Sequence, residues 1–375
     1  MRFGLQILSF KPGELGGQGI FIRRLLSHLV PKLGPDRLVI FLRPQLASEP
    51  QFGELDRHAS VRLVVQTPDQ HHGDGYADWN LRLLESAELD VVYFPLSFFF
   101  PRPLPIPVLL HVPDLQHEYF PQYFPPDQLA WRRERIPDSV RCADAVISYT
   151  RFSVSGLRDK LGADERKLHT IGIGGFLDSD IQAALDAGAE PPGGLGDRPF
   201  IFYPAADWPH KNHETLLRAI AILARSGRRE QLVLTGIMSQ RGDELRRLAD
   251  ELGISDRLHW LGRVSQDKLI ALYRAARLMA FPSRFEGFGI PLVEAMQLGC
   301  PIVASKAEAV RETAGDAAEY CDDDPERWAE TLARVLSDES IREDLRRRGK
   351  RRARDFDWER CADKHLALLR ELARR

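Results

Sequence analysis

The chain has few cysteines, and none of them forms a recognisable pair. Cys142, Cys300, Cys321 and Cys361 lie far apart, without a Cys-x-x-Cys motif or the spacing of a metal site. Proteins held together by disulfides or structural zinc show denser cysteine patterns. We therefore expect free thiols and a reducing, cytoplasmic compartment.

The chain also lacks a strong excess of either charge and a long uninterrupted apolar stretch. A net charge of −2 argues against a general nucleic-acid-binding protein, which would carry a basic domain. The most apolar segment, residues 91–112, is broken by repeated prolines and by Arg102, which excludes an ordinary membrane helix. The first residues show no basic leader or cleavage site, so we expect no signal peptide.

Short apolar runs alternate with segments of helical spacing, a pattern typical of α/β domains with parallel sheets. The expected strands are 5–10, 38–42, 61–65, 91–94, 108–111 and 145–148, then 200–203, 231–235, 258–261, 278–281 and 301–304. Residues 184–198, rich in alanine, glycine and proline, are typical of a linker. We expect two doubly wound domains, 1–185 and 198–357, with a cleft between them and ligands outside the carboxyl ends of the strands.

The most informative motif lies after the expected strand 278–281. Glu286 and Glu294 flank a turn and the start of a helix, with the sequence Gly-Phe-Gly-Ile-Pro between them. Glycines allow a ligand to approach the backbone closely, and proline suits the first helical turn. The helix start would attract phosphate or sugar oxygens, and a carboxylate can accept hydrogen bonds from adjacent hydroxyls. An ordinary early-helix acid is the alternative for either glutamate alone.

Two further loops follow expected strands. Lys211 and Asn212, within Trp-Pro-His-Lys-Asn-His, precede a helix, where Asn212 is a suitable N-cap and Lys211 a flexible cation for a diphosphate. A solvated turn lysine is the alternative. The first loop, residues 13–19, is rich in glycine but lacks the Gly-Lys-Ser/Thr ending of a Walker loop, and it is a weak signal alone.

Together these segments resemble the retaining glycosyltransferases of the GT-B fold in the large family four, which includes bacterial mannosyl-, glucosyl- and rhamnosyltransferases. The Glu-x7-Glu element matches with its core intact, and Pro-His-Lys-Asn resembles the segment that carries the family's phosphate lysine. Residues 261–264, 272–276 and 356–359 also resemble family segments. The resemblance implies two Rossmann-like domains and a last helix, about 358–375, that crosses back to the first domain.

The resemblance also implies the reaction: a sugar passes from a nucleoside diphosphate to an acceptor hydroxyl with retained configuration. No cofactor or metal is implied. Lys211 would bind the diphosphate, Glu294 the ribose and Glu286 the transferred sugar. The attack would occur on the face from which the phosphate departs, with neither glutamate as the nucleophile. The substrate-binding set implied is Gly16, Gly17, Gln18, Gly19, Asn212, Gly262, Arg263, Gly287, Phe288, Gly289, Ile290 and Glu294.

The chain departs from the family pattern at two places. Many relatives carry an arginine before the phosphate lysine, whereas residues 203–206 here contain none, and Arg284 is the candidate replacement. Many relatives also place His-Asp after the fourth strand of the first domain, where this chain has proline followed by Asp114. Asp114 and His117 are therefore candidate catalytic or acceptor contacts, and a loop histidine bonded to backbone is the alternative for His117.

Two other segments favour simpler interpretations. Asp322, Asp323 and Asp324 lie far from the glutamate motif in sequence and are typical of a solvated turn, not of a metal site. The basic run 346–354 is typical of a solvated helix surface, with a contact to anionic lipid as the alternative.

Bacterial polysaccharide synthesis, with a glycan or lipid-linked glycan as acceptor, is the expected role. A nucleotide-sugar epimerase of the same fold and a non-catalytic nucleotide-sugar-binding protein are the rival functions.

Overall fold

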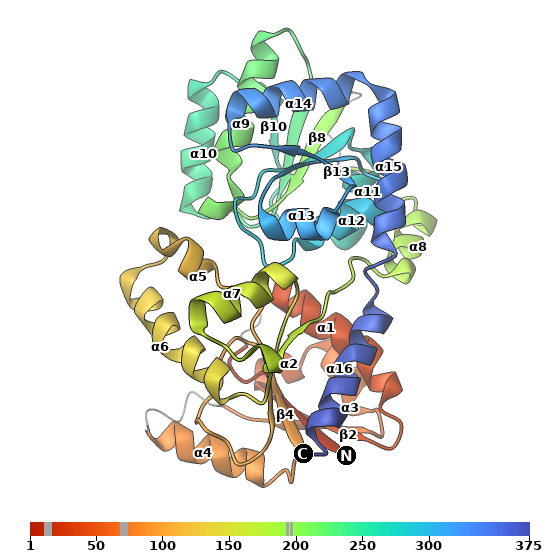
Figure 1. Cartoon of the computed structure of the whole chain (residues 1–375). Helices are drawn as coiled ribbons and strands as arrows, with labels where there is room; N and C mark the ends of the chain where they lie inside the picture. The colour runs from red at the N-terminus through yellow and green to blue at the C-terminus, as the bar shows by residue number, and fades with distance from the viewer. Residues whose placement is uncertain (11–16, 68–73, 193–194, 196–197) are drawn as a thin grey trace. The chain divides into compact units, whose positions relative to one another are not determined.

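The chain folds into two compact units. The computed structural model describes residues 1–10, 17–67, 74–192, 195 and 198–375. Unit 1 comprises Met1–Ile173 and Asp357–Arg375, and unit 2 comprises Gly174–Phe356 (Figure 1). Every strand pairing described in the two sheets is parallel. This confirms the expected α/β class with two Rossmann-like halves.

Unit 1 contains a seven-stranded sheet in the order β3-β2-β1-β4-β5-β6-β7. The strands are β1 Arg2–Gln6, β2 Arg37–Leu42, β3 Val61–Val65, β4 Val91–Phe94, β5 Val108–His111, β6 Ala145–Ser148 and β7 Leu168–Thr170. The helices are α1 Gly17–Leu29, α2 Pro44–Ala47, α3 Pro50–Asp56, α4 Asp74–Glu85, α5 Gln116–Tyr119, α6 Pro126–Cys142, α7 Arg151–Leu161 and α16 Trp358–Leu372. The strand order reverses between β1 and β4, as in a doubly wound fold.

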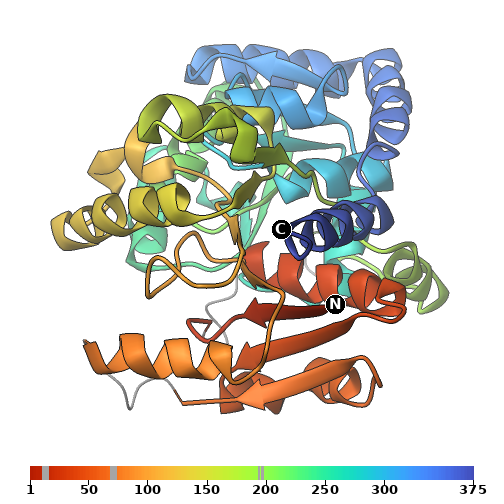
Figure 2. The same ribbon diagram turned by 60° about the horizontal axis from the view of Figure 1, so that its bottom comes forward.

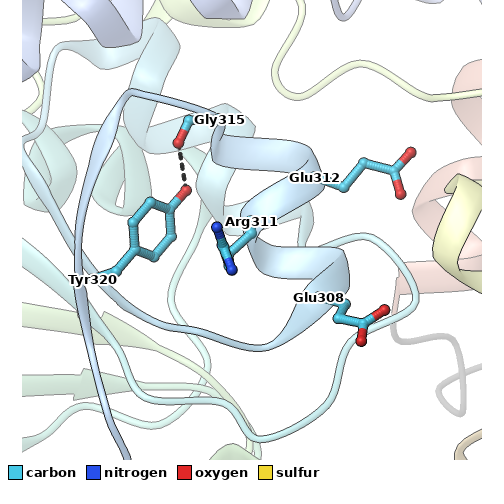
Figure 3. A pocket seen from close by; sticks show the side chains of 5 residues that line it. All are labelled: Glu308, Arg311, Glu312, Gly315 and Tyr320. Carbon is cyan, nitrogen blue, oxygen red and sulfur yellow. Dashed lines mark hydrogen bonds between the residues drawn. The ribbon is translucent and has the colours of Figure 1, made fainter.

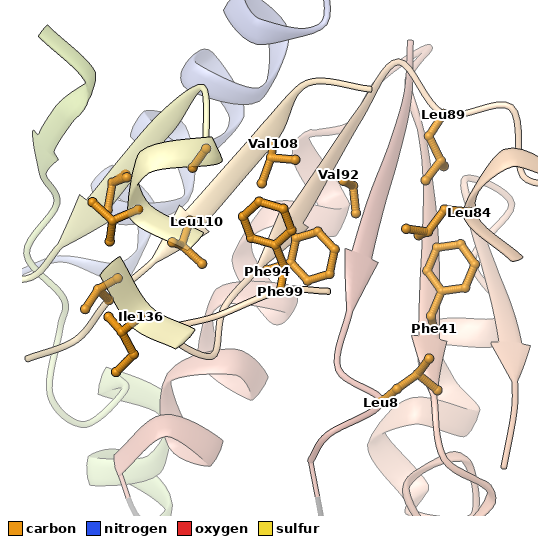
Figure 4. Close-up of a cluster of buried hydrophobic side chains, with 14 of the residues drawn as sticks. Leu8, Phe41, Leu84, Leu89, Val92, Phe94, Phe99, Val108, Leu110 and Ile136 are labelled. Atoms are coloured by element: carbon orange, nitrogen blue, oxygen red, sulfur yellow. The ribbon is translucent and has the colours of Figure 1, made fainter. Parts of the chain in front are cut away.

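One face of the unit 1 sheet carries a continuous apolar core. Side chains from β2, β4 and β5 pack against helices α4, α6 and α7 (Figure 4). Phe94 and Phe99 stack with their ring centroids 5.1 Å apart, and both are nearly fully buried. Phe99 therefore belongs to the core although it lies in the loop after β4.

Helix α16 covers the opposite face of this sheet, beside α1 (Figures 1 and 2). Asp36 accepts hydrogen bonds from the amino group of Met1 and from Nε of Arg370, each at 2.8 Å. Lys32 pairs with Glu359 and Asp363 at the other end of the helix. The last helix thus packs with the first part of the chain, as the sequence resemblance implies.

Two buried imidazoles lie between α16 and the sheet. The hydroxyl of Tyr93 is 3.5 Å from Nδ1 of His111 and 3.5 Å from Nε2 of His365, and His365 Nδ1 is 2.8 Å from the carbonyl of Cys361. Burial lowers the pKa of His365 to about 4. Burial, with His365 as its neighbour, holds the pKa of His111 well below its ordinary value. Both side chains are therefore neutral in the fold.

This cluster predicts that unit 1 loses stability in mild acid. In the unfolded chain the imidazoles titrate near pH 6.5, so between pH 6.5 and 4 the unfolded state binds more protons than the folded state. The free energy of unfolding should therefore decrease as the pH is lowered from 6.5 to 4, by up to about 1.4 kcal/mol per pH unit for each histidine. Denaturant melts at pH 7 and pH 5 test this. His365→Gln should show a shallower dependence, and a slope equal to that of the wild type would contradict the assignment.

Unit 2 contains a six-stranded sheet in the order β10-β9-β8-β11-β12-β13. The strands are β8 Phe200–Pro204, β9 Gln231–Thr235, β10 Leu258–Trp260, β11 Leu278–Phe281, β12 Ile302–Ser305 and β13 Ala318–Cys321. The helices are α8 Asp178–Asp186, α9 His213–Arg225, α10 Gln240–Glu251, α11 Gln266–Ala275, α12 Ile290–Leu298, α13 Glu308–Ala314, α14 Pro325–Ser337 and α15 Glu339–Ala353. No helix in the described ranges combines the length and apolar character needed to cross a membrane.

The division between the units differs from the expected one. We expected the first domain to extend to residue 185, but unit 1 ends at Ile173 and resumes at Asp357. The reason is that α8 packs against α11 and so belongs to unit 2. The stretch 184–198 begins with the last residues of α8 and falls within unit 2, so it does not link the two units.

Candidate functional site

The topology of unit 2 brings two of the predicted loops together. Its strand order reverses between β8 and β11, which pair in parallel, so the loops after these strands leave from the same edge of the sheet. The loop after β8 carries Lys211, and the loop after β11 carries Glu286. Ligands of doubly wound sheets bind outside the carboxyl ends of the strands at such a reversal.

Lys211 and Glu286 form an ion pair at this position. The Nζ atom of Lys211 is 2.6 Å from Oε1 of Glu286, and the two side chains are only 18% and 10% exposed. Lys211 ends a short 3₁₀ helix, η5 (Pro209–Lys211), and its carbonyl accepts a 2.7 Å hydrogen bond from the hydroxyl of Tyr203. The backbone N–H of Arg284 donates to the carbonyl of His210 at 2.7 Å and joins the two loops. The structure thus brings together two residues 75 positions apart.

Asn212 occupies the N-cap position of α9, but its side chain does not cap the helix. The residue is in the left-handed region, with φ 58° and ψ 42°, a conformation that asparagine tolerates better than most residues. Its side-chain amide donates to Asp323 at 2.7 Å and to the carbonyl of Pro282 at 3.3 Å. The N-cap position was therefore predicted correctly, whereas the role of the side chain is to connect loops.

The turn after β11 leads directly into helix α12. Gly289 precedes the helix with φ 88°, and a Cβ there would lie 2.9 Å from Leu292 Cδ1, so only glycine fits without strain. The carbonyl of Phe288 accepts a 2.7 Å hydrogen bond from the hydroxyl of Thr313. Ile290 begins the helix, whose positive end lies beside the turn from Gly287 to Gly289. A rigid backbone next to a helix start is suited to sugar or phosphate oxygens.

Glu294 lies on the same helix and is buried. It is 8% exposed, and its Oε2 accepts a 2.8 Å hydrogen bond from the hydroxyl of Tyr273. Burial, together with the nearby Glu294 carboxylate, raises the pKa of Tyr273 well above its ordinary value, so the phenol keeps its proton and donates. Tyr273 was noted only as part of a family segment. A buried tyrosine on the neighbouring helix α11 could not be paired with Glu294 from sequence spacing.

The two histidines beside Lys211 are neutral. Burial, with a smaller contribution from the adjacent Lys211, lowers the pKa of His210 to about 3. Burial likewise lowers the pKa of His213 to about 4. The histidines therefore act as packing side chains, and Lys211 is the cation of the ion pair with Glu286.

The prediction for the three aspartates after β13 was wrong in one respect. Asp323 does not belong to an isolated solvated turn, because it accepts hydrogen bonds from Arg284 Nε at 2.6 Å and Thr215 Oγ1 at 3.0 Å as well as from Asn212. Burial alone would raise the pKa of Asp323, but the hydrogen bonds from Arg284 and Asn212 outweigh it and lower the pKa. Strand β13, which the sequence did not predict, ends at this edge and delivers the carboxylate to the site.

Arg284, the candidate second cation, is held by this carboxylate. The guanidinium and the Asp323 side chain are 35% and 43% exposed, so their ion pair is partly solvated and weak. Asp324 caps α14 through the backbone N–H of Arg327, and Asp322 pairs with Lys306. Within the described ranges, no three His, Cys, Asp or Glu side chains gather in a way that could hold a metal ion. Metal independence stays a prediction.

Gly262 and Arg263 follow β10, farther along the same edge of the sheet. Gly262 has φ 64°, and its carbonyl accepts a 2.8 Å hydrogen bond from the backbone N–H of Gly236 after β9. A Cβ on Gly236 would lie 2.7 Å from the backbone of Ala205, so the loops after β8, β9 and β10 are closely packed. The structure thus places Gly262 and Arg263 at the predicted edge, and their part in substrate binding stays a prediction.

The remaining predicted residues belong to unit 1. Asp114 accepts a 2.9 Å hydrogen bond from the backbone N–H of Gln116, and His117 is completely buried. Burial lowers the pKa of His117 to about 4, so the imidazole is neutral and its 3.7 Å approach to Glu118 is no ion pair at neutral pH. Gly17, Gln18 and Gly19 begin α1, and Gly16 lies outside the described residues. The roles of these residues toward substrate stay predictions.

The basic run 346–354 lies on α15 and its C-terminal end, and carboxylates of unit 2 neutralise much of it. Arg346 pairs with Glu339 at 2.7 Å, and Arg351 pairs with Asp316 at 2.5 Å. Arg347 and Arg348 both pair with Asp344, and Arg352 pairs with Asp355. These contacts favour the interpretation of a solvated, internally paired helix surface.

A pocket of about 450 Å³ opens on α13, away from the ion pair. It is lined by Glu308, Arg311, Glu312, Gly315 and Tyr320 (Figure 3). Tyr320 donates a 2.6 Å hydrogen bond to the carbonyl of Gly315, while the two glutamates point away from the tyrosine (Figure 3). None of the predicted site residues lines this pocket, and its charges do not define a ligand.

The two parallel-sheet units, each with a reversal of strand order, have the architecture of the GT-B class. Residues 190–352 match the family described as glycosyl transferases group 1. This range contains the Lys211 loop, the Glu286 turn and helix α12. Within this range the chain is similar to this family.

Similarity to individual proteins extends beyond the matched range. O-antigen chain mannosyltransferase B of Escherichia coli is 28% identical over 277 residues, 72% of each chain. D-inositol 3-phosphate glycosyltransferase of Mycolicibacterium smegmatis is 33% identical over 60% of this chain, which spans about half (52%) of that relative's length. These proteins are similar to this chain, and the activities in their names are those of the relatives.

Solved structures confirm the fold over nearly the whole chain. Sucrose-phosphate synthase of Thermosynechococcus elongatus matches with a TM-score of 0.75 at 20% identity, covering 99% of both chains. Anabaena HepE, in its complex with UDP and glucose, matches with a TM-score of 0.71 at 19% identity, covering 99% of this chain and 100% of that one. At these identities the likeness shows the GT-B architecture.

Proposed function

We propose that the protein is a retaining glycosyltransferase that moves a sugar from a nucleoside diphosphate to an acceptor hydroxyl. The observation that carries the proposal is the Lys211–Glu286 pair at the strand reversal of unit 2, beside the start of α12. It combines a cation for the diphosphate, a carboxylate for sugar hydroxyls and a backbone suited to anions. The UDP and glucose in the HepE complex support a nucleotide-sugar donor by analogy.

In this proposal, Lys211 stabilises the charge that develops on the leaving diphosphate. Because His210 is neutral, Lys211 is the group of this short helix that supplies positive charge to a phosphate. A fixed ammonium group in a partly dry site lowers the barrier without any proton transfer by the protein. Arg284, two residues before Glu286, is the candidate second cation.

Glu286 and Glu294 have separate tasks in the proposed mechanism. Glu286 accepts hydrogen bonds from the transferred sugar, and Glu294, oriented by Tyr273, accepts them from the ribose. The acceptor attacks on the face from which the diphosphate departs, and the departing phosphate takes its proton. No carboxylate serves as the covalent nucleophile, in contrast to retaining glycosidases.

We further propose that the acceptor is a bacterial glycan or lipid-linked glycan, handled in the cytoplasm at or near the inner face of the membrane. The O-antigen mannosyltransferase among the similar proteins supports this role by analogy. An enzyme that extends a lipid-linked chain would meet its acceptor at that surface.

The function is tested first by donor binding and then by turnover. A thermal-shift screen with UDP-, GDP- and dTDP-sugars should raise the melting temperature for one nucleotide class, since a ligand that binds only the folded state stabilises it. The matching donor should then release nucleoside diphosphate faster when the correct glycan acceptor is added. Isomerised sugar formed from donor alone would identify an epimerase instead. Binding without any reaction across an acceptor panel would support a binding protein.

A further inference from the structure

The polypeptide passes between the units twice, and both passages are attached to the loop and helix that carry the two glutamates. The first passage enters unit 2 after Ile173, and the second leaves it after Phe356. We propose that Gln297 and Thr313 are positioning residues that couple occupation of the donor site to these two passages. The inference rests on the proposed function and adds residues that do not touch the donor.

At the first passage, the backbone of Phe176 is bound by the side chain of Gln297 on α12. The N–H of Phe176 donates to Gln297 Oε1 at 2.9 Å, and Gln297 Nε2 donates to the carbonyl of Phe176 at 3.1 Å. The preceding residue, Gly175, approaches α12 so closely that a Cβ would lie 2.4 Å from Gln297 Oε1 and 3.2 Å from the backbone nitrogen of Glu294. A side chain at position 175 would displace the Gln297 amide and press against the backbone of α12.

The same segment also reaches Glu294 through an aromatic contact. The ring of Phe176 packs edge-on against Tyr273 at a centroid distance of 6.1 Å. Tyr273 in turn donates its hydroxyl hydrogen to Glu294, the proposed ribose ligand, at 2.8 Å. A shift of Glu294 on ligand binding would thus displace Phe176, both through Tyr273 and through α12 itself. Closely packed interiors transmit small displacements in this way.

At the second passage, Phe356 packs on the turn that would hold the sugar. Its ring contacts Phe288 edge-on at a centroid distance of 5.4 Å, and the guanidinium of Arg352 lies 4.9 Å from the Phe356 ring centre. Arg352 donates to the carbonyls of Thr313 and Glu312 at 3.1 Å and 2.7 Å. Thr313 closes the connection by donating its hydroxyl hydrogen to the Phe288 carbonyl.

The two connections converge on one short element. Residues 288–297 contain Phe288 at one end and Gln297 at the other, with Glu294 between them. Each end of this element is bound to a different passage of the chain. Its position therefore depends on both passages, and a ligand that moves or rigidifies it should change the dynamics of both.

Hydrogen exchange tests the coupling directly. In the wild type, adding the nucleoside diphosphate found in the donor screen should slow amide exchange at residues 174–177 and 354–358. Gln297→Met keeps the side-chain volume but removes both hydrogen bonds to Phe176. It should bind the nucleotide within about threefold of the wild type and abolish the ligand-induced protection at 174–177. Turnover should fall on the order of tenfold with little change in donor KM, because misplaced reacting groups slow the chemical step.

Thr313→Val gives an independent arm at the second passage, where ligand-induced protection at 354–358 should disappear. Gln182→Met is the matched control, because its amide bonds to Asp186 on the surface of α8. Melting curves of all variants test whether they are folded. If nucleotide binds the wild type but exchange at both passages is unchanged, the coupling is wrong while the proposed function stands. If no nucleotide binds at all, the proposed function fails and the coupling fails with it.

Discussion

Lys211→Met should lose nearly all sugar transfer, with turnover reduced by on the order of 10²–10³-fold or more. The methionine keeps most of the side-chain length and removes the ammonium group that we place on the leaving diphosphate. Nucleoside diphosphate binding should also weaken, because the cation that attracts it is gone. Release of nucleoside diphosphate at saturating donor and acceptor measures the first effect, and calorimetric titration measures the second.

Lys306→Met provides the matched control for this prediction. Lys306 follows β12 at the same edge of the sheet, but it is half-exposed and pairs with Asp322 at 2.8 Å. The same substitution there should leave turnover within about twofold, as expected for a surface ion pair. Because Lys211→Met leaves Glu286 without its partner in a largely buried position, its melting temperature must be measured as well. A folded Lys211→Met variant with near-normal turnover would remove Lys211 from the mechanism.

The sequence predicted the central strands well because their apolar runs are buried on both faces. Strands β4, β5, β6 and β11 were predicted at their observed positions, and all four are fully buried. Parallel strands covered by helices on both sides read as continuous apolar segments. The two missed strands, β7 and β13, lie at sheet edges and include partly exposed residues, so their sequences carry no such run.

The first strand shows the limit of hydrophobicity as evidence for strand pairing. We expected residues 5–10, but β1 is Arg2–Gln6. Ile7 and Leu8 are buried and Ile7 still donates to the carbonyl of Phe41, although the ladder has ended. The apolar run 5–10 therefore reflects burial of the chain, which continues past the end of β1 at Gln6. Burial and strand pairing coincide in central strands and separate where a strand turns into a loop.

The site was predictable where one segment carried the whole pattern, and it was not predictable where partners came from distant elements. Glu286, Glu294 and Lys211 could be proposed as site residues because glycine, proline and helix-start signals surround them in sequence. Asp323 and Tyr273 carry no local signal, because their importance arises only when strand order and helix packing bring them to the site. Such partners require the fold, since they lie 111 and 21 residues from the groups they bind.

The Lys211–Glu286 pair has a consequence that separates binding from catalysis. The ammonium group of Lys211 is engaged by the Glu286 carboxylate at 2.6 Å, so we expect a diphosphate to compete with Glu286 for it. Glu286→Gln removes this competing charge but keeps the size of the side chain. We expect the variant to bind nucleoside diphosphate at least as tightly as the wild type. Its turnover should nevertheless fall about 100-fold or more, because the charged acceptor for the sugar hydroxyls is lost.

Glu294→Gln is the contrasting variant on the same helix. Glu294 is 8% exposed and bonded to Tyr273, and we assign it to the ribose, so its amide should weaken nucleotide binding instead of preserving it. Titration of both variants with nucleoside diphosphate, beside their turnover with complete donor, tests the two assignments together. If Glu286→Gln loses nucleotide affinity as Lys211→Met does, the pair acts as a single structural unit and the competition is absent. If it gains affinity while losing turnover, the ion pair serves both to hold Lys211 in place and to favour release of the diphosphate product.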